Sequence, residues 1–575
     1  MRQLSSYTSI ARWLLSYWKD FRGQALLNTF LGISLVGLNL GLVAATKLTI
    51  DIATGQCRDF TLLQGLSLIG GIILTQVFLG FVSRWVKAVL GVRSQNRMQR
   101  RLFHRLLCGD WSSLRQYHSG DVLNRMLKDV SNIVSLLTED IPAILTTLVQ
   151  FIGAFLLLYY MDKHLALIVV IIAPFFILVS KLYVRRLRRL THEVREADSG
   201  IQAMMQESMQ HSLVIKTLER VEHVVGKLAQ QQGHLRACVM HKTTYSSISA
   251  MVMSLGFGIG YMVTFAWGVY QLQEGTGGYG QFLAFIQLVG QMQSPVRALS
   301  QYIPVLISAA TASERLMEME QMPLEKSMLE VSSLRETPQS GRENILPAPE
   351  PIDTLLLENV DYAYVNGSRP ILQNFSYSFP PGSITAIQGE TGAGKTTLIR
   401  LLLALVAPLK GKVGFRSPDG RFSAIDVTSR RRFSYVPQGN TLLSGTIREN
   451  LLLGNPFAHE AEMWRALHVA AADFVKQLPL RLDTLCTEMG GGFSEGQAQR
   501  LCIARTLLRD SEVMIFDEST SALDAETESK VIERIIDYCQ GRTLIFITHR
   551  PSVLKFCTQH LKLSRHSSFP EQSLC

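Results

Sequence analysis

The sequence Gly389-Glu390-Thr391-Gly392-Ala393-Gly394-Lys395-Thr396 follows the apolar run Ile384–Ile387 and precedes a predicted helix over Thr397–Ala407. A strand that leads through a glycine-rich turn into a helix directs backbone N–H groups and the helix N-terminus at a bound phosphate. In such a loop Lys395 reaches the β- and γ-phosphates, and the Thr396 hydroxyl is a ligand for Mg²⁺. The stretch from Gly389 to Thr397 therefore predicts an α/β domain that binds a nucleoside triphosphate.

A second motif downstream supplies carboxylates. Val513-Met514-Ile515-Phe516-Asp517 is a continuous apolar run that ends in an acid, as expected of a strand buried on both faces of a parallel sheet. Asp517 would hold Mg²⁺ through water, and Glu518 would polarise the water that attacks the phosphate. The alternative is an acidic strand end that faces solvent, and the phosphate loop upstream favours the catalytic interpretation.

The first half of the chain is apolar. Charged residues make up 18% of the sequence, and the mean hydropathy is +0.16. Six stretches, the last interrupted only by Arg297, are long and apolar enough to cross a hydrocarbon layer of about 30 Å. They are 24–46, 61–83, 141–161, 165–180, 248–271 and 281–312. We predict a membrane domain over 23–320, preceded by an interfacial amphipathic helix within 1–22.

Lysine and arginine predict the orientation of these spans. They concentrate in the connections 84–139 and 181–247, whereas the opposite loops hold only Lys47, Arg58 and Lys163. Both long connections and both termini are therefore predicted to be cytoplasmic. The net charge of +10 follows from this pattern. A nucleic-acid-binding surface is disfavoured, because the basic residues flank the spans.

A polar segment separates the two halves. Residues 321–351 carry several prolines and no periodicity, which predicts an extended linker before a nucleotide-binding domain over 352–575. The eight cysteines are scattered, and no pair has metal-ligand spacing, so we interpret them as free thiols.

Five further segments occur at positions that suggest one family. They are Tyr364, Tyr435-Val436-Pro437-Gln438, Phe493-Ser494-Glu495-Gly496-Gln497, Ser521-Ala522-Leu523-Asp524 and Ile547-Thr548-His549-Arg550. Together with the phosphate loop and the Asp517–Glu518 pair, they resemble type IV ABC transporters, which have the exporter fold. The resemblance covers nearly the whole chain. It implies a six-helix transmembrane domain fused to an α/β P-loop ATPase domain that hydrolyses ATP to ADP and phosphate.

The resemblance also implies roles for these residues. Glu518, His549 and Gln438 would be catalytic, and Tyr364 would stack on adenine. Gln438 would also sense Mg²⁺, beside the ligands Thr396 and Asp517. The remaining contacts to ATP would come from Ser494, Gly496, Gln497 and Asp524.

One nucleotide-binding domain cannot build a complete site in this family, because the signature helix meets the γ-phosphate held by another subunit. The chain would therefore pair with a second half-transporter, identical or different. Gly120–Arg125 and Val214–Lys216, with Glu219, resemble the segments that rest on the nucleotide domains. Thr487–Gly490 resembles a loop that contacts the membrane domain.

Three features depart from the family pattern. Glu495 replaces the usual signature glycine, and Ser511 stands where proline is common. Only 26 residues follow His549, and the usual final strand turn and closing helix are not recognisable in Phe556–Cys575. We expect a looser domain edge there.

The transported substrate is the least determined feature. Candidate cavity residues are Asn28, Asn39, Gln287, Gln291, Gln293, Trp267, Met251, Met253 and Met262. Three functions compete: export of an amphipathic peptide, drug or lipid; import of siderophore-like cargo on the same fold; and regulation by ATP binding without transport. Glu518 and His549 argue against the third, and family frequency argues against import. The expected location is a bacterial inner membrane.

Overall fold

The computed structural model describes residues 7–19, 22–56, 59–115, 117, 119–325, 354–364, 370–487, 492–564 and 571–573. The chain divides into two compact units. A helical unit contains residues 1–104 and 119–321, and an α/β unit contains residues 105–118 and 322–575. Most of the predicted linker lies outside the described residues.

The helical unit is built from long helices and short connecting ones. Its helices are α1 (Tyr7–Trp18), α2 (Arg22–Ala53), α3 (Leu62–Leu107), α5 (Ser119–Asn124), α6 (Val130–Ser135), α7 (Ile141–Met161), α8 (Lys163–Gln210), α9 (Ser212–Thr217), α10 (Val221–Gln273) and α11 (Tyr279–Glu320). Wider turns at Arg125–Asp129 and Leu136–Asp140 flank α6.

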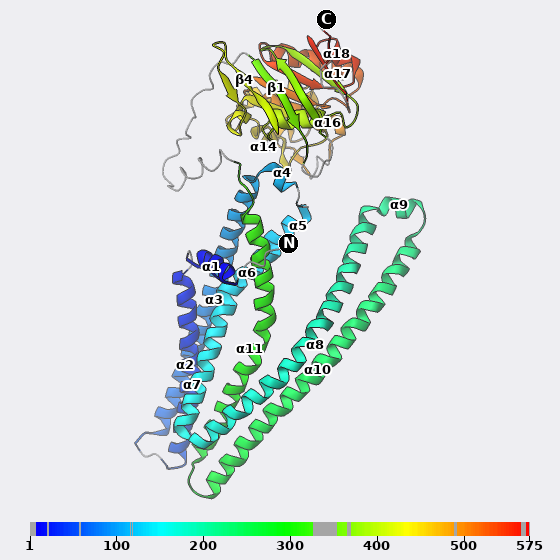
Figure 1. The fold of residues 1–575 in the computed structure, drawn as a ribbon. Coiled ribbons are helices and arrows are strands. Elements are labelled where there is room, and N and C mark those ends of the chain that lie inside the picture. The colour runs from blue at the N-terminus through cyan, green and yellow to red at the C-terminus, as the bar shows by residue number, and fades with distance from the viewer. Residues whose placement is uncertain are drawn as a thin grey trace. The chain divides into compact units, whose positions relative to one another are not determined.

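Two groups of helices can be distinguished in this unit. Helices α2, α7 and α11 pack against one another, whereas α8 and α10 run side by side and are joined by α9 at one end (Figure 1). At the opposite end, Asp162, which lies between α7 and α8, holds α8 to α10. Its carboxylate caps α8 by accepting a bond from the Leu165 N–H at 2.9 Å and accepts another from Trp267 Nε1 of α10 at 2.9 Å. We refer to α8, α9 and α10 together as the α8–α9–α10 arm, and these two bonds hold α8 and α10 together at the end opposite α9.

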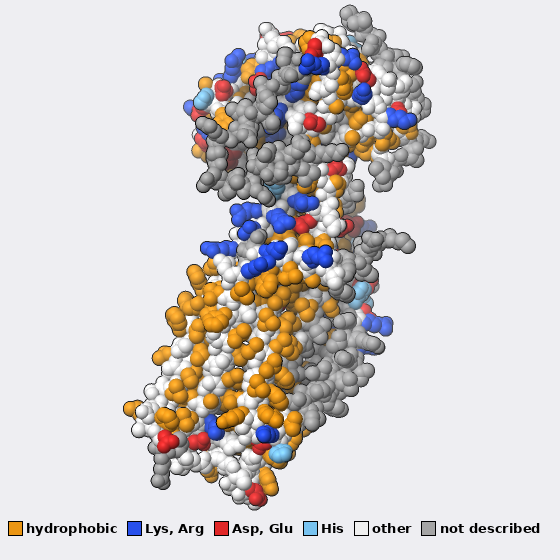
Figure 2. All heavy atoms as spheres, turned by 60° about the vertical axis from the view of Figure 1, so that its left-hand side comes forward, with side chains coloured by type: hydrophobic (Ala, Val, Ile, Leu, Met, Phe, Trp, Pro, Cys, Tyr) orange, Lys and Arg blue, Asp and Glu red, His pale blue; other side chains and the backbone are white. Residues whose placement is uncertain are grey.

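Four described helical segments are long and apolar enough to cross a membrane: Arg22–Ala53, Leu62–Leu107, Gly120–Met161 and Val221–Gln273. The predicted spans 165–180 and 281–312 fall within α8 and α11, and they remain predictions. Helix α3 exposes Leu74, Phe78 and Phe81. Figure 2 shows hydrophobic side chains covering the visible face of the helices, with Lys and Arg gathered at one end. This distribution is typical of a surface in contact with lipid.

Helix α1 is the predicted amphipathic helix, and a single carboxylate ties it to the end of α11. Glu320 accepts hydrogen bonds from Trp13 Nε1 at 2.6 Å and from the Tyr17 hydroxyl, and it pairs with Arg101 at 3.3 Å. Arg101 also lies over the Tyr17 ring, 4.7 Å from its centroid.

The α/β unit contains a six-stranded sheet with the order β12-β11-β3-β10-β9-β6 and a four-stranded antiparallel sheet with the order β2-β1-β4-β5. The first sheet contains β3 (Ile384–Gly389), β6 (Phe433–Val436), β9 (Val513–Asp517), β10 (Thr543–Ile547), β11 (Gln559–Leu563) and β12 (Glu571–Ser573). The second contains β1 (Thr354–Tyr362), β2 (Leu372–Phe379), β4 (Lys410–Arg416) and β5 (Phe422–Ala424), and β7 (Gly445–Thr446) pairs with β8 (Leu485–Cys486). The helices are α4 (Trp111–Leu114), α13 (Lys395–Leu402), α14 (Ile447–Leu452), α15 (Glu460–Val469), α16 (Glu495–Leu507), α17 (Ala525–Tyr538) and α18 (Pro551–Leu554).

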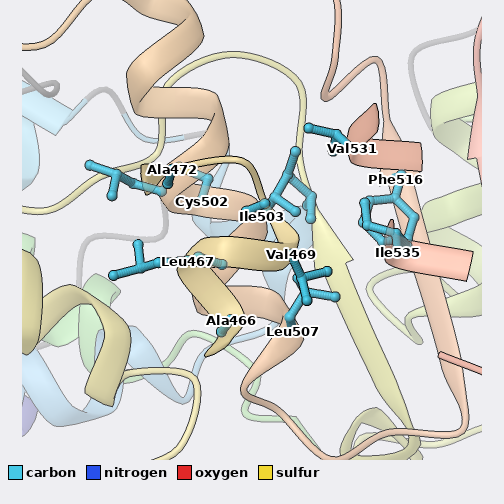
Figure 3. Close-up of a cluster of buried hydrophobic side chains, with 14 of the residues drawn as sticks. Ala466, Leu467, Val469, Ala472, Cys502, Ile503, Leu507, Phe516, Val531 and Ile535 are labelled. Carbon is cyan, nitrogen blue, oxygen red and sulfur yellow. The ribbon is translucent and has the colours of Figure 1, made fainter. Parts of the chain in front are cut away.

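The parallel sheet forms because its central strands are buried on both faces. Every residue of β9 and β10 is buried, and the two strands pair in parallel register from Val513–Thr543 to Asp517–Ile547. On one face, α15, α16 and α17 pack around Ile503, Phe516 and Ile535 (Figure 3). The predicted apolar runs at 384–387 and 513–517 thus lie in neighbouring parts of one sheet.

The C-terminal segment differs from the expectation of a loose edge. Strand β11 pairs in parallel with β3, from Gln559–Thr385 to Leu563–Gly389, and β12 pairs antiparallel with β11. Leu561 and Leu563 of β11 are buried. The short sequence after His549 therefore still extends the sheet, and the inner face of β11 contributes to its core. No closing helix follows β11 in the described residues.

One stretch from the first half of the sequence belongs to the α/β unit. It is Arg105–His118, in which the Asp110 carboxylate caps α4 and the Asp110 N–H donates to Pro323 O at 2.8 Å. Arg125 pairs with Glu318 of α11 at 2.9 Å inside the helical unit. The expectation that Gly120–Arg125 rests on the nucleotide domain stays a prediction.

Candidate ATP-hydrolysis site

Four neighbouring parallel strands end at one edge of the six-stranded sheet, and each is followed by a predicted site motif. Strand β3 ends at Gly389 and β9 at Asp517, while His549 follows β10 and Gln438 follows β6. Ligands of open α/β sheets bind outside the carboxyl ends of the strands. The sheet order therefore brings motifs from four separate parts of the sequence to one edge.

The phosphate loop has the strand–turn–helix geometry that its sequence predicts. Gly394 caps α13 with φ of 99°, a left-handed conformation that a side chain would strain, and Cβ at this position would also lie 3.0 Å from Ile371 Cγ2. Thr391, Gly392 and Thr396 are exposed, whereas Ala393 and Thr397 are buried. Part of the loop is thus accessible to a ligand, and the rest is buried in the domain.

Two adjacent carboxylates at the end of β9 have different environments. Asp517 is buried and accepts a hydrogen bond from the Tyr435 hydroxyl at 3.0 Å. Burial raises the pKa of the Asp517 carboxyl, and neighbouring Glu518 adds to the rise against the lowering effect of Tyr435. Glu518 has φ of 47° and accepts a bond from Gln438 Nε2 at 2.8 Å. A non-glycine residue in this conformation is held there by its surroundings.

The histidine after β10 lies beside the phosphate-loop lysine. Lys395 Nζ is 3.1 Å from His549 Nε2, and it also contacts the Gly389 carbonyl. His549 is exposed. The structure thus brings five predicted site residues to one edge of the sheet. Lys395 contacts His549, Gln438 contacts Glu518, and Asp517 is buried.

The signature segment begins helix α16. Ser494 Oγ accepts a bond from the Gln497 N–H at 3.3 Å, and Gln497 Oε1 accepts one from the Ser494 N–H at 3.0 Å. Glu495 occupies the exposed first position of the helix, where a negative charge is favourable to the helix dipole. Cβ at Gly496 would lie 2.9 Å from the Ala522 carbonyl oxygen, so glycine permits close approach of the next motif.

The segment Ser521–Asp524 is held by two residues that we did not predict as site residues. Gln499, buried on α16, donates to Ser521 Oγ at 3.1 Å and accepts from the Ala522 N–H at 3.1 Å. Arg550 donates to the Leu523 carbonyl at 2.8 Å and to the Ser521 carbonyl. Arg550 is the last residue of the quoted segment Ile547–Arg550, and Gln499 lies two residues after Gln497. Their nearness to these motifs was the available sequence signal.

Asp524 caps α17 by accepting a bond from the Thr527 N–H at 2.9 Å. This contact lowers the pKa of the Asp524 carboxyl. In the chain as described, its carboxylate is engaged in its own helix. Glu488–Gly490 of the predicted membrane-domain contact lie outside the described residues.

Tyr364 belongs to a cluster of aromatic and basic side chains in the α/β unit. Its hydroxyl accepts a bond from Arg400 Nη1 at 2.5 Å, and its ring meets Tyr362 edge-on with centroids 5.1 Å apart. The Arg400 guanidinium also lies 4.7 Å from the Trp111 ring centroid. The tyrosine predicted to stack on adenine is thus linked through Arg400 to the segment Arg105–His118.

The side chains at this edge include oxygen donors of the kind that Mg²⁺ uses. The described residues contain no group of three or more His, Cys, Asp or Glu side chains that could hold an ion. Mg²⁺ commonly takes one or two protein oxygens and completes its shell with phosphate and water. The Asp517 carboxylate and the Thr396 hydroxyl are hard oxygen donors of this kind.

Comparison with known proteins agrees with this geometry. Residues 26–296 match the model of the ABC transporter transmembrane region, and residues 372–521 match the ABC transporter model. An ATP-dependent lipid A-core flippase of Chromohalobacter salexigens is 27% identical over 568 residues, which cover 96% of this chain and 93% of that protein. An uncharacterized ABC transporter ATP-binding protein of Bacillus subtilis, YfiC, is 27% identical over 76% of this chain and 70% of that protein.

A solved structure of a bacterial Atm1-family ABC exporter with ATP bound has a TM-score of 0.75 to this chain. It covers 96% of this chain and 94% of its own at 21% identity, which establishes a shared fold. The fold and site define an ATP-driven membrane transporter. The two family models together match more than half of the chain, which therefore belongs to the ABC transporters, with a membrane and an ATPase domain in one polypeptide.

Proposed function

We propose that this chain is a half-transporter that exports an amphipathic substrate, working as a dimer in a bacterial inner membrane with both termini in the cytoplasm. The observation that carries the proposal is the edge of the parallel sheet, where Lys395, Asp517, Glu518, Gln438 and His549 meet. ATP hydrolysis needs positioned charge and a positioned water, and the charged and polar side chains at this edge are of the kinds that would position both.

The predicted site residues would have separate roles in ATP hydrolysis. The N–H groups from Gly389 to Thr397 and the Lys395 ammonium bind the phosphates of ATP. Glu518 accepts a proton from the attacking water, and its bond to Gln438 at 2.8 Å orients the carboxylate. His549, which follows β10 and lies beside Lys395, would donate to the γ-phosphate. Asp517 and Thr396 would hold Mg²⁺, which neutralises charge on the phosphates when it is bound.

Two surfaces support a dimer. The N-terminus of α16, with Ser494 and Glu495 exposed, has its positive end available to a nucleotide outside its own phosphate loop. In the helical unit, α9 and the following turn expose Leu213 (74%) and Leu218 (64%) at the tip of the α8–α9–α10 arm. Exposed apolar side chains at the end of such an arm are expected to be covered by a partner.

The substrate class is supported by the surroundings and by the relatives. The lipid-facing surface of α3 would let an apolar chain approach from the bilayer. Several relatives are called lipid A-core flippases, which act on an amphipathic lipid. We therefore place this chain among exporters that handle lipid-like molecules.

The test is lipid movement in liposomes that contain the purified chain. A lipid fluorescently labelled on its tail should change leaflet when ATP is added, and a membrane-impermeant quencher would report the change. The Glu518→Gln variant should bind ATP without moving lipid. Equal movement with and without ATP, or in the variant, would contradict the proposal.

A further inference from the structure

A polar cavity lies within the helical unit, among α2, α3, α7 and α11. Its volume of about 620 Å³ falls within the roughly 300–1,000 Å³ typical of small-molecule sites. Its polar lining consists of four carboxamides and two hydroxyls: Asn39, Gln150, Gln287, Gln291, Thr46 and Ser294. Among its described lining residues there is no charged side chain.

The lining is organised as stripes along helix faces. Helices α2 and α11 each contribute residues at positions i, i+3, i+4 and i+7, which share one face of a helix. The two stripes are Asn39, Leu42, Val43 and Thr46 on α2, and Gln287, Gly290, Gln291 and Ser294 on α11. On α3, Ile69 and Ile73 are four residues apart and form an apolar wall. The cavity therefore has a polar side and an apolar side.

The cavity lies deep along the helices. Asn39 is 14 residues before the end of α2 at Ala53, and Gln291 is 12 residues after the start of α11 at Tyr279. At 1.5 Å per residue these positions are about 21 Å and about 18 Å from the helix ends. Both positions also fall inside the predicted spans 24–46 and 281–312, so the carboxamides lie within the hydrocarbon layer, where polar groups are costly and generally serve a function.

The polar groups in the cavity are only partly satisfied. Asn39 Oδ1 accepts a bond from Gln76 Nε2 of α3 at 3.0 Å. Gln291 Oε1 is enclosed, and it has no hydrogen-bond partner among the described residues. Asn39, Gln287 and Ser294 are exposed, so the cavity is open to an entering molecule. A ligand that donates a hydrogen bond would satisfy Gln291.

We propose that this cavity binds the uncharged, hydroxyl-rich head group of the exported molecule, such as a sugar, with the apolar chain along Ile69 and Ile73. Each carboxamide offers a donor and an acceptor, and a hydroxyl matches either end because it can donate and accept. A charged head group that loses part of its hydration between the helices would need a counter-charge, and the lining supplies none. A peptide would need its N–H and C=O groups in a fixed order. This assignment rests on the proposed function.

The test measures binding directly and needs no ATP turnover. Native mass spectrometry of the full chain, in a detergent without a sugar head group, would compare four probes. They are glucosylceramide, ceramide, phosphatidylserine and a neutral acylated triglycine amide. Wild type should retain glucosylceramide about tenfold more than the other three, as expected for one or two added hydrogen bonds. Stronger binding of phosphatidylserine or of the peptide would overturn the assignment.

Variants locate the binding. Gln291→Leu should lower glucosylceramide binding about tenfold, and Gln281→Leu, on the same helix outside the cavity lining, should not. Gln287→Leu, at an exposed lining position that tolerates replacement, should also lower it and keeps the test valid if Gln291→Leu does not fold. If both lining variants bind glucosylceramide as wild type does and lipid movement is intact, the cavity is not the head-group site, while the proposed export function stands. If glucosylceramide binds specifically but no lipid moves when ATP is added, the proposed export function is wrong, while the assignment of the cavity as the head-group site stands.

Discussion

The ATP edge of the α/β unit and the polar cavity of the helical unit are both built from residues far apart in sequence, but in different ways. At the ATP edge each contribution is a short contiguous motif at the end of a strand, such as Gly389–Thr396 after β3. In the cavity each contribution is a stripe spaced along a helix. Backbone geometry makes the first kind of site, whereas helix packing makes the second. A site that depends on backbone N–H groups is therefore easier to recognise in the sequence than a site that depends on helix packing.

The largest expected effect tests the ATP edge. Glu518→Gln should lower ATP turnover by about a thousandfold, because general-base catalysis contributes about 10² to 10⁴. ATP binding should persist, since the phosphate loop is unchanged. Phosphate release from the chain in lipid nanodiscs measures turnover. Glu526→Gln, at an exposed position of α17, is the matched control and should behave as wild type. Retained turnover in Glu518→Gln would assign the base elsewhere.

Lys395→Ala should weaken nucleotide binding itself. Loss of a charged hydrogen-bond donor costs about 1.5–3 kcal/mol, or roughly tenfold to a hundredfold in affinity. Titration with a fluorescent ATP analogue provides the measurement. Lys530→Ala removes an exposed lysine paired with Glu526 and is the control. An unchanged dissociation constant for Lys395→Ala would show that the loop binds ATP without this side chain.

Gln499→Leu tests whether a residue of α16 outside the predicted motifs affects ATP turnover. Its two bonds to Ser521 and Ala522 position the segment beside Gly496, so turnover should fall about tenfold. The KM for ATP should stay within about twofold, because Gln499 does not line the phosphate loop. A parallel rise in KM, or unchanged turnover, would contradict this positioning role.

Asp517→Asn should stabilise the nucleotide-free chain at pH 7. Burial raises the pKa of Asp517 above its usual 3.8, so its ionised form costs folding free energy at neutral pH. Asparagine removes that cost. The gain in Tm should shrink as pH is lowered through the raised pKa and vanish below about 3.8, where Asp517 is protonated in both states. A gain independent of pH would point to a cause other than ionisation.

The smallest effect is expected for Glu495→Gly. The carboxylate is exposed at the first position of α16, where it favours the helix N-terminus by about 0.3–1 kcal/mol. Turnover should therefore change by less than about threefold, in either direction. A large rise in turnover would show that Glu495 repels the phosphate of a partner-bound ATP.

Much of the fold could be predicted from sequence, because its signals are local. The runs 384–387 and 513–517 became β3 and β9, and the span 141–161 coincides with α7. The weaker predictions depended on distant partners. The sequence after His549 shows no usual closing element, yet β11 finds its pairing partner in β3, about 170 residues earlier in the chain.

The sequence by itself determined the class of this protein, its phosphate loop and the residues expected to act on ATP. Those features depend on turn geometry and on charge at strand ends, which neighbouring residues specify. Only the tertiary structure decided which segment joins the α/β unit, how Gln499 and Arg550 brace Ser521–Asp524, and that Asn39, Gln150 and Gln291 line one cavity. These contacts join helices and strands that are distant in the chain, and side-chain packing specifies them.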